Sequence, residues 1–166
     1  MMRQMRRSRQ ELTSKECDQV LERQTSGVLA VLGDEGYPYA VPLSYVYENG
    51  KLYFHCAKEG HKLDAIRKDN KVSFCVVDQD QVVPEEYTTY FRSVIVFGTA
   101  RQLEDEKEKR QALAALAAKY SPHEVEGREK EIQSQFSRVA LVEITPNCIT
   151  GKEAIELTRK KHPSLL

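Results

Sequence analysis

An Asn49-Gly50 pair joins two alternating segments and largely decides the fold class. Residues 39–47 alternate with the period of a strand, and residues 51–56 form the return strand. Asn-Gly favours the tight turn of an antiparallel hairpin. Parallel strands need a long crossover connection instead, so a doubly wound parallel sheet is the weaker alternative.

The rest of the chain supplies four more strands and several helices. Strands are predicted over 28–32, 72–77, 89–103 and 138–145, and helices over 14–24, 61–68, 105–120 and 126–135. Thr13 and Glu16 form a capping box at the first helix, which Gly27 is expected to end. Local breaks are predicted as a polar loop over 79–87, a bend or bulge at Gly98 and a strand end at Pro146. Six strands that do not alternate regularly with helices predict a mainly β fold with helices (β+α), a small antiparallel barrel.

Length and composition narrow the class of protein. The 166 residues suit a single domain over 1–166, with a basic N-terminal arm at 1–12 and a C-terminal tail at 150–166. Lys+Arg and Asp+Glu are both 25, so the net charge is zero, which argues against a nucleic-acid partner. No apolar run is long enough for a membrane span, and no apolar core follows the basic N-terminus as in a signal peptide.

The four cysteines show no C-x-x-C spacing, which favours reduced thiols in a cytoplasmic protein. We interpret them as core residues rather than nucleophiles. His55 and Cys56 are adjacent on a strand, so their side chains point to opposite faces and we expect no metal site. The common nucleotide-binding and hydrolase motifs are also missing from the sequence.

Positive side chains gather at the start of the predicted helix over 61–68. Lys58, His61 and Lys62 surround the flexible Gly60. Cations are unfavourable at a helix N-terminus, where the helix dipole is positive. With the free amides of the first turn, they favour an anion site, most simply for a phosphate. A solvated basic loop is the alternative interpretation.

Pro42 interrupts the strand one hairpin earlier. Proline cannot donate to a ladder, so this strand lies at a sheet edge or is distorted there. An edge backbone can hydrogen-bond a planar heterocycle, and the return strand leads directly to the basic cluster. A phosphorylated flavin matches that arrangement, although a bulge without a ligand explains Pro42 equally well.

Three blocks of the chain carry a resemblance to a known family. They read P-Y-A-V-P-L, H-C-A-K-E-G-H-K and Y-F-R-S-V-I-V-F-G, and the later segment ITGKEAIEL follows the same pattern. Together they resemble the Nim-type 5-nitroimidazole resistance proteins, within the pyridoxamine 5′-phosphate oxidase-like flavin-binding split barrels. The resemblance covers residues 3 to 160. The C-terminal basic residues of the oxidase itself have no counterpart, which weakens the case for pyridoxal phosphate synthesis.

The resemblance implies a six-stranded split β-barrel that forms a homodimer, with FMN in grooves between the subunits. It places Val41, Pro42, Leu43 and Ser44 along the flavin ring, His55, Cys56, Ala57 and Lys58 beneath the flavin, and His61 with Lys62 at the phosphate. Arg92, Ser93 and Val94 come from the long strand, of the same or the partner subunit. His55 is the side chain expected nearest the reactive face, as a proton donor or as a purely structural histidine.

Three functions follow from these expectations. The first is an FMN-dependent oxidoreductase that reduces small nitro-heteroaromatic compounds such as 5-nitroimidazoles. The second is an FMN- or haem-binding split barrel without that turnover, in which His55 could serve as an axial ligand. The third is a cofactor-free dimer whose basic loop is only solvated. A dimer is expected because the strand over 89–103 is apolar on both faces and needs to be covered on both.

Overall fold

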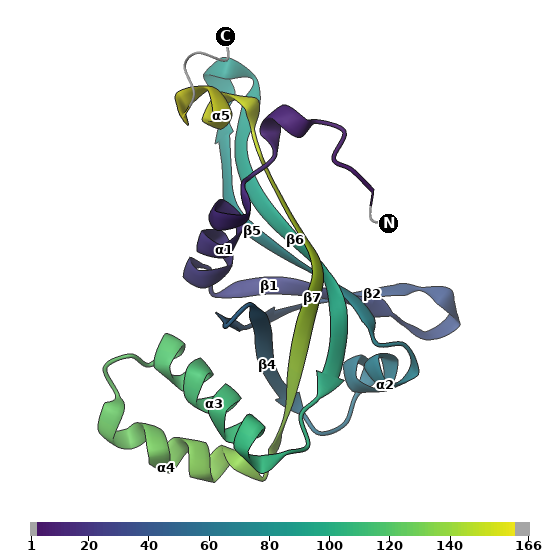
Figure 1. The fold of residues 1–166 in the computed structure, drawn as a ribbon, viewed down its shortest axis with the longest axis vertical. Helices are drawn as coiled ribbons and strands as arrows, with labels where there is room; N and C mark the ends of the chain where they lie inside the picture. The colour runs from purple at the N-terminus through teal and green to yellow at the C-terminus, as the bar shows by residue number, and fades with distance from the viewer. Residues whose placement is uncertain (1–2, 162–166) are drawn as a thin grey trace.

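A computed structural model describes residues 3–161 as a strongly curled antiparallel sheet flanked by helices (Figure 1). Within these residues seven strands are hydrogen-bonded in the order β2-β1-β5-β6-β7-β4-β3. The strands are β1 (Ser26–Leu32), β2 (Pro38–Ser44), β3 (Val46–Glu48), β4 (Lys51–Ala57), β5 (Lys71–Val83), β6 (Thr88–Gln102) and β7 (Val139–Glu153). The helices are α1 (Ser14–Arg23), α2 (His61–Lys68), α3 (Glu106–Tyr120), α4 (Val125–Phe136) and α5 (Ile155–Lys161), with 3₁₀ turns η1 (Ser8–Gln10), η2 (Asp34–Gly36) and η3 (Pro84–Glu86).

The predicted mainly β, antiparallel fold is confirmed, with one strand more than the six expected. The additional strand arises because the predicted strand over 39–47 is divided at Tyr45 into β2 and β3. Tyr45 is fully buried, and its backbone N–H donates to the Tyr120 hydroxyl over 2.9 Å. The Tyr45 N–H also makes a longer bond of 3.4 Å to the Thr25 carbonyl, just before β1, and the β1–β2 ladder ends at Ser44.

The capping box at α1 is present as predicted, with Glu16 N–H donating to the Thr13 hydroxyl and the Glu16 carboxylate accepting from the Thr13 amide. The helix ends at Arg23, so the expectation that Gly27 ends it is wrong. Gly27 lies inside β1, where an added Cβ would overlap the Phe74 ring. Its small size therefore serves core packing rather than a helix terminus.

The predicted polar loop over 79–87 is also wrong. β5 continues to Val83 and forms a long hairpin with β6, and only the η3 turn and Tyr87 separate the strands. The hairpin projects beyond the barrel, as the top of Figure 1 shows. Its tip faces water, because Val82 is 68% and Tyr87 97% exposed. A strand without a buried face lacks the alternation from which strands are predicted.

β7 likewise continues past Pro146, where the sequence predicted its end. A register shift beside Gly98 pairs Phe97 with Cys148 and Gly98 with Pro146, which leaves Asn147 without a partner in β6. This bulge accommodates a residue that has no N–H to donate. Of the bend or bulge predicted at Gly98, the structure shows a bulge. The predicted tail over 150–166 begins inside β7 and continues as α5.

The end of the predicted N-terminal arm is docked on the sheet. The buried Gln10 side chain donates to the Glu153 carbonyl over 3.0 Å, and Leu12 N–H donates to the Gly151 carbonyl over 2.9 Å. η1 lies beside α5 at this end of the molecule (Figure 1). Residues 1, 2 and 162–166, which belong to the predicted arm and tail, lie outside the described residues.

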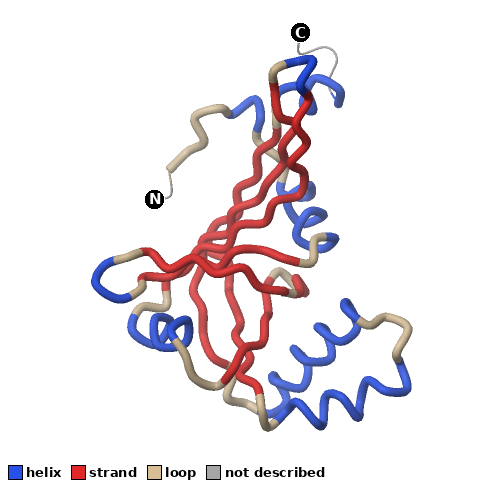
Figure 2. The backbone as a smooth tube through the Cα atoms, turned by 180° about the vertical axis from the view of Figure 1, so that it is seen from behind, coloured by secondary structure: helices blue, strands red, loops and turns tan. Residues whose placement is uncertain are grey.

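Two apolar cores hold these layers together. The first fills the barrel, and its fully buried residues include Leu29, Phe54, Phe74, Val94 and Val142. The second lies between the sheet and the α3–α4 hairpin and includes Leu103, Leu113, Leu116, Ile132 and Leu141. Figure 2 shows this hairpin extending from the barrel on the side away from α2. Within residues 3–161, no helix is both long and apolar enough to cross a membrane.

Candidate functional site

The barrel stays open along one side, between the two ends of the strand order. β2 pairs only with β1, so its outer edge has no strand partner within the described residues. β4 pairs with β7 along one edge but with β3 only over Lys51–Tyr53, which leaves the edge of residues 54–57 free of strand pairing. The sequence prediction that Pro42 lies on an edge strand is therefore confirmed. Two backbone edges with unpaired polar groups border the opening.

The residues predicted to line the flavin ring alternate across β2. Val41 and Leu43 pack against the barrel core, whereas Pro42 and Ser44 are exposed on the outer face. On β4, Cys56 is buried in the core, and its neighbours His55 and Ala57 are exposed on the opposite face. The outward side chains and the free backbone edges are the groups that a ligand could reach.

The predicted basic cluster follows β4 directly. Gly60 has φ +132, a conformation that a residue with a Cβ rarely adopts, and no side chain caps α2. His61 stacks on Tyr39 of β2 with ring centroids 4.2 Å apart, and its Nε2 lies 3.6 Å from a carboxylate oxygen of Asp34. The stack joins the start of α2 to one end of the open β2 edge. His61 and Lys62 are therefore positioned at the end of the opening.

The three predicted residues of the long strand lie elsewhere in the subunit. Val94 is fully buried in the barrel core. Arg92 is bound by two carboxylates, with its Nε 3.0 Å from Glu153 and an Nη 3.0 Å from Asp78. Ser93 pairs with Val77 and is half-buried on the outer face of the sheet. Within the described chain, none of the three lies at the β2–β4 opening.

Asp78 is the centre of the ion-pair network that holds Arg92. It also accepts hydrogen bonds from Arg23 and Gln24 at the end of α1. Burial by itself raises the pKa of Asp78, but the hydrogen bonds from Arg23, Gln24 and Arg92 outweigh burial and lower the pKa to about 2. This network ties α1 to the sheet and accounts structurally for Arg92.

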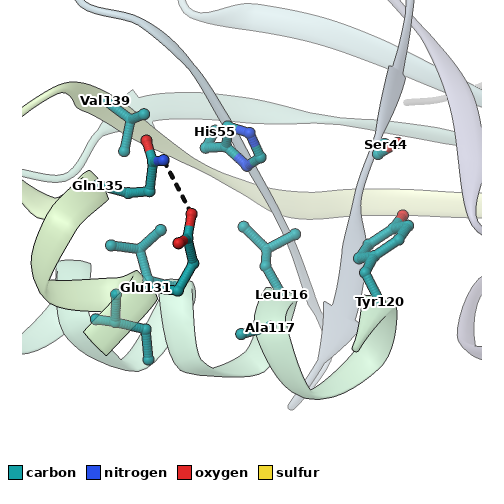
Figure 3. A pocket seen from close by; sticks show the side chains of 10 residues that line it. Ser44, His55, Leu116, Ala117, Tyr120, Glu131, Gln135 and Val139 are labelled. Atoms are coloured by element: carbon teal, nitrogen blue, oxygen red, sulfur yellow. Dashed lines mark hydrogen bonds between the residues drawn. The ribbon is translucent and has the colours of Figure 1, made fainter. Parts of the chain in front are cut away.

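A cavity of about 360 Å³ adjoins the other end of the opening (Figure 3). Two predicted site residues, Ser44 and His55, line it together. The remaining lining residues come from α3, α4 and the start of β7: Leu113, Leu116, Ala117, Tyr120, Glu131, Ile132, Gln135 and Val139. Within the described chain, no hydrogen bond involves the His55 imidazole.

Sequence reasoning missed the helical wall of this cavity. The only available signal was the alanine-rich run before Tyr120, whose small side chains leave space beside the larger Leu116. Tyr120 fixes the wall, because its hydroxyl lies 2.9 Å from the Tyr45 amide nitrogen and 2.8 Å from the Tyr45 carbonyl oxygen. These contacts attach the end of α3 to the turn between β2 and β3.

Other titratable groups have structural explanations. The buried Glu143 carboxylate accepts from Arg101 over 2.9 Å and from Tyr53 over 3.1 Å, and pairs with Lys51 at 3.1 Å. Burial raises the pKa of the Cys17 thiol to about 11, so this cysteine is a poor nucleophile. Burial also raises the pKa of Cys56. These groups stabilise the fold. The side chains left for ligand binding or chemistry lie at the opening and its cavity.

Comparisons with known proteins place this geometry in a family. Residues 13–153 match the family described as pyridoxamine 5′-phosphate oxidase. A crystal structure of a candidate 5-nitroimidazole antibiotic resistance protein from Bacteroides thetaiotaomicron is 23% identical, with a TM-score of 0.72 and 86% of each chain covered. No curated protein matched the chain.

Two further solved structures are similar. An FAD-binding protein from Mesorhizobium loti is 26% identical, with a TM-score of 0.65, covering 87% of this chain and 96% of its own. An FAD and haem binding protein from Mycobacterium smegmatis is 20% identical, with a TM-score of 0.73, covering 88% of this chain and 73% of its own. Because most of the sequence matches the family and the solved structures have the same curled barrel, the chain belongs to the pyridoxamine 5′-phosphate oxidase family and has its split β-barrel fold.

Proposed function

We propose that the protein binds FMN along the β2–β4 opening and acts as an oxidoreductase on nitro-heteroaromatic compounds such as 5-nitroimidazoles. The observation that carries the proposal is the order of groups along the opening. Cations at the start of α2 stand at one end, free backbone edges follow, and the apolar cavity beside His55 adjoins the other end. A flavin phosphate, ring and substrate require these three environments in that order.

The residues present fit the cofactor. Lys58, Lys62 and His61, with the uncapped amides of α2, would hold the phosphate, and the edges of β2 and β4 would hydrogen-bond the ring. FMN is favoured over FAD because the cluster can close on one terminal phosphate and the sequence has no Gly-rich dinucleotide motif. The similar proteins from Mesorhizobium loti and Mycobacterium smegmatis are named for FAD, so the choice of flavin is testable.

His55 is proposed as the catalytic residue. When bound, FMN supplies two-electron transfer, while the protein supplies orientation and protons. The His55 imidazole is exposed at the cavity, and histidine is the side chain that exchanges protons near neutral pH. We expect His55→Ala to retain FMN but to slow reoxidation of the reduced flavin by a nitroimidazole about 10²-fold. An unchanged reoxidation rate in anaerobic stopped-flow measurements would show that His55 is structural.

We also propose a homodimer with the flavin at the subunit interface. Val28, Ile95 and Phe97 are 36–37% exposed and Val77 is 56% exposed, although they lie on the outer face of adjacent central strands. A face of this kind is expected to be covered. Light scattering of the purified protein should give twice the chain mass, and Ile95→Glu should give a monomer. A wild-type monomer at micromolar concentration would contradict the proposal and remove the interface as a site for flavin.

A second candidate is an FMN- or haem-binding protein without nitro reduction. The exposed His55 imidazole favours it, since such a group can also ligate haem iron. Mass spectrometry of the ligand released on denaturation distinguishes flavin from haem. If FMN is released, mixing the reduced protein with a nitroimidazole without oxygen decides between turnover and simple binding. In a reductase the nitro compound reoxidises the bound flavin, whereas in a simple binding protein the flavin stays reduced.

The free cysteines are consistent with the proposed cytoplasmic location.

A further inference from the structure

The cavity between β4 and the α3–α4 hairpin has a distribution of charge that the proposed reaction does not by itself require. Its floor is apolar, formed by Leu113, Leu116, Ala117, Ile132 and Val139. Its polar groups lie around this floor, and no lysine or arginine is among the residues that line it. The only lining side chain with a fixed charge is the carboxylate of Glu131.

Glu131 is held in place by its own helix. Gln135 Nε2 donates to Glu131 Oε1 over 2.9 Å, one turn further along α4. Figure 3 shows the Glu131 carboxylate and the Gln135 amide on the side of α4 that faces the His55 strand. Within residues 3–161, no protein group donates to Glu131 Oε2, so this oxygen can accept a hydrogen bond from a ligand.

We infer that this cavity is the substrate site of the proposed reductase and that it selects flat aromatic rings that are neutral or positively charged over anionic ones. That the cavity binds the substrate rests on the proposed function. Its preference for flat rings of a given charge rests on the cavity itself. An apolar floor with a few polar groups suits a small aromatic ring. A carboxylate without a neighbouring cation attracts an amine or ring N–H and repels a second carboxylate.

The opening is therefore polarised from end to end. Lys58 and Lys62 provide positive charge before and at the start of α2, where the cofactor phosphate is proposed. Glu131 provides negative charge at the cavity. A phosphorylated or carboxylated substrate would meet the wrong sign of charge in the cavity. The same arrangement separates the substrate class of this protein from phosphorylated pyridoxamine.

Binding of three probes with one ring and different charges tests the inference. Nitrobenzene, 4-nitrobenzylamine and 4-nitrobenzoate are measured by equilibrium dialysis against the protein as purified, with no reductant present, since the chain has no tryptophan to report binding. We expect the amine to bind at least as tightly as nitrobenzene, and the benzoate at least fivefold more weakly. The same order is expected for KM if the flavin-loaded protein reduces the probes.

Three variants test where the probes bind. Glu131→Gln should weaken the amine about fivefold, the size of a partly exposed ion pair, and leave nitrobenzene unchanged. Glu126→Gln removes an equal charge from α4 without lining the cavity and should change neither. Ala117→Phe fills the cavity from α3 and should abolish binding of all three probes, while bound FMN and the thermal melt confirm that the variant is folded.

The outcomes separate this inference from the proposed function. If the three probes bind in the expected order of affinity, lose binding in Ala117→Phe, and none is reduced, the result supports the site and contradicts the reductase. Reduction of all three probes with equal KM supports the reductase and overturns the charge selectivity of the site. Binding that survives in Ala117→Phe overturns the site, whether or not the probes are reduced. Equal effects of Glu131→Gln and Glu126→Gln on the amine would overturn the assigned role of Glu131.

Discussion

Asp78→Asn removes one negative charge from the network that holds α1 and Arg92, with little change in side-chain shape. The Asp78 side chain is 4% exposed and pairs with Arg23 at 2.5 Å and Arg92 at 3.0 Å. Its pKa is lowered from 3.8 to about 2. Each pKa unit corresponds to about 1.4 kcal/mol, so the charge stabilises the folded state by about 2–3 kcal/mol at neutral pH. We expect the variant to lose that amount of unfolding free energy.

The loss should depend on pH with a definite sign. The folded-state pKa of Asp78 lies below the unfolded-state pKa, so its stabilisation is complete above pH about 4. As the pH falls towards 2, the wild-type carboxylate takes up a proton and this stabilisation disappears. The difference in unfolding free energy between wild type and Asp78→Asn should therefore shrink from pH 4 to pH 2. Glu16, whose pKa is also lowered to about 2, contributes equally to both proteins and cancels.

Urea unfolding at several pH values between 2 and 7 measures this difference. Asp80→Asn is the matched control, because Asp80 is an exposed residue on the same strand of the hairpin and should cost less than about 0.5 kcal/mol. A difference between wild type and Asp78→Asn that stays constant over the whole pH range would refute the reasoning. The loss would then come from altered hydrogen bonding by asparagine rather than from the charge.

Two further pairs of variants test the site and the sheet. Lys62→Glu places a negative charge at the proposed phosphate site and should lower FMN occupancy of the purified protein several-fold. Lys68→Glu at the far end of α2 should not lower it. Equal occupancy in both variants would contradict the phosphate assignment. Gly98→Ala should destabilise the protein by about 1–3 kcal/mol in urea unfolding, because its Cβ would overlap the Thr145 carbonyl oxygen. Gly127→Ala has open space inside α4 and should stabilise the protein by about 0.5–1 kcal/mol. If Gly98→Ala were the more stable of the two variants, the β6–β7 bulge would have to move to make room for the added methyl group.

Several features of the fold and site were predictable from sequence because they depend on residues only a few positions apart. The Thr13–Glu16 capping box, the Asn49-Gly50 hairpin and the bounds of α2 are local in this sense. The edge position of Pro42 followed from its missing N–H. The location of the basic cluster, beside the end of β4, followed from chain order. These features survive because their partners lie within one turn or hairpin, whereas the single-residue signals at Gly27 and Pro146 were overruled by packing and pairing with distant strands.

Long-range contacts decided the rest. Tyr45 ends β2 because a tyrosine 75 residues later bonds its amide, and no local pattern reports such a partner. Arg92 is held by carboxylates 14 and 61 residues away, and no local pattern in the sequence indicates either partner. The cavity that joins His55 to Glu131 exists only where α3 and α4 fold back over the sheet. The sequence by itself therefore determined the antiparallel class, the Asn49-Gly50 turn and the capping box, whereas the tertiary structure decided where strands end and which charges are paired, because both depend on distance in space.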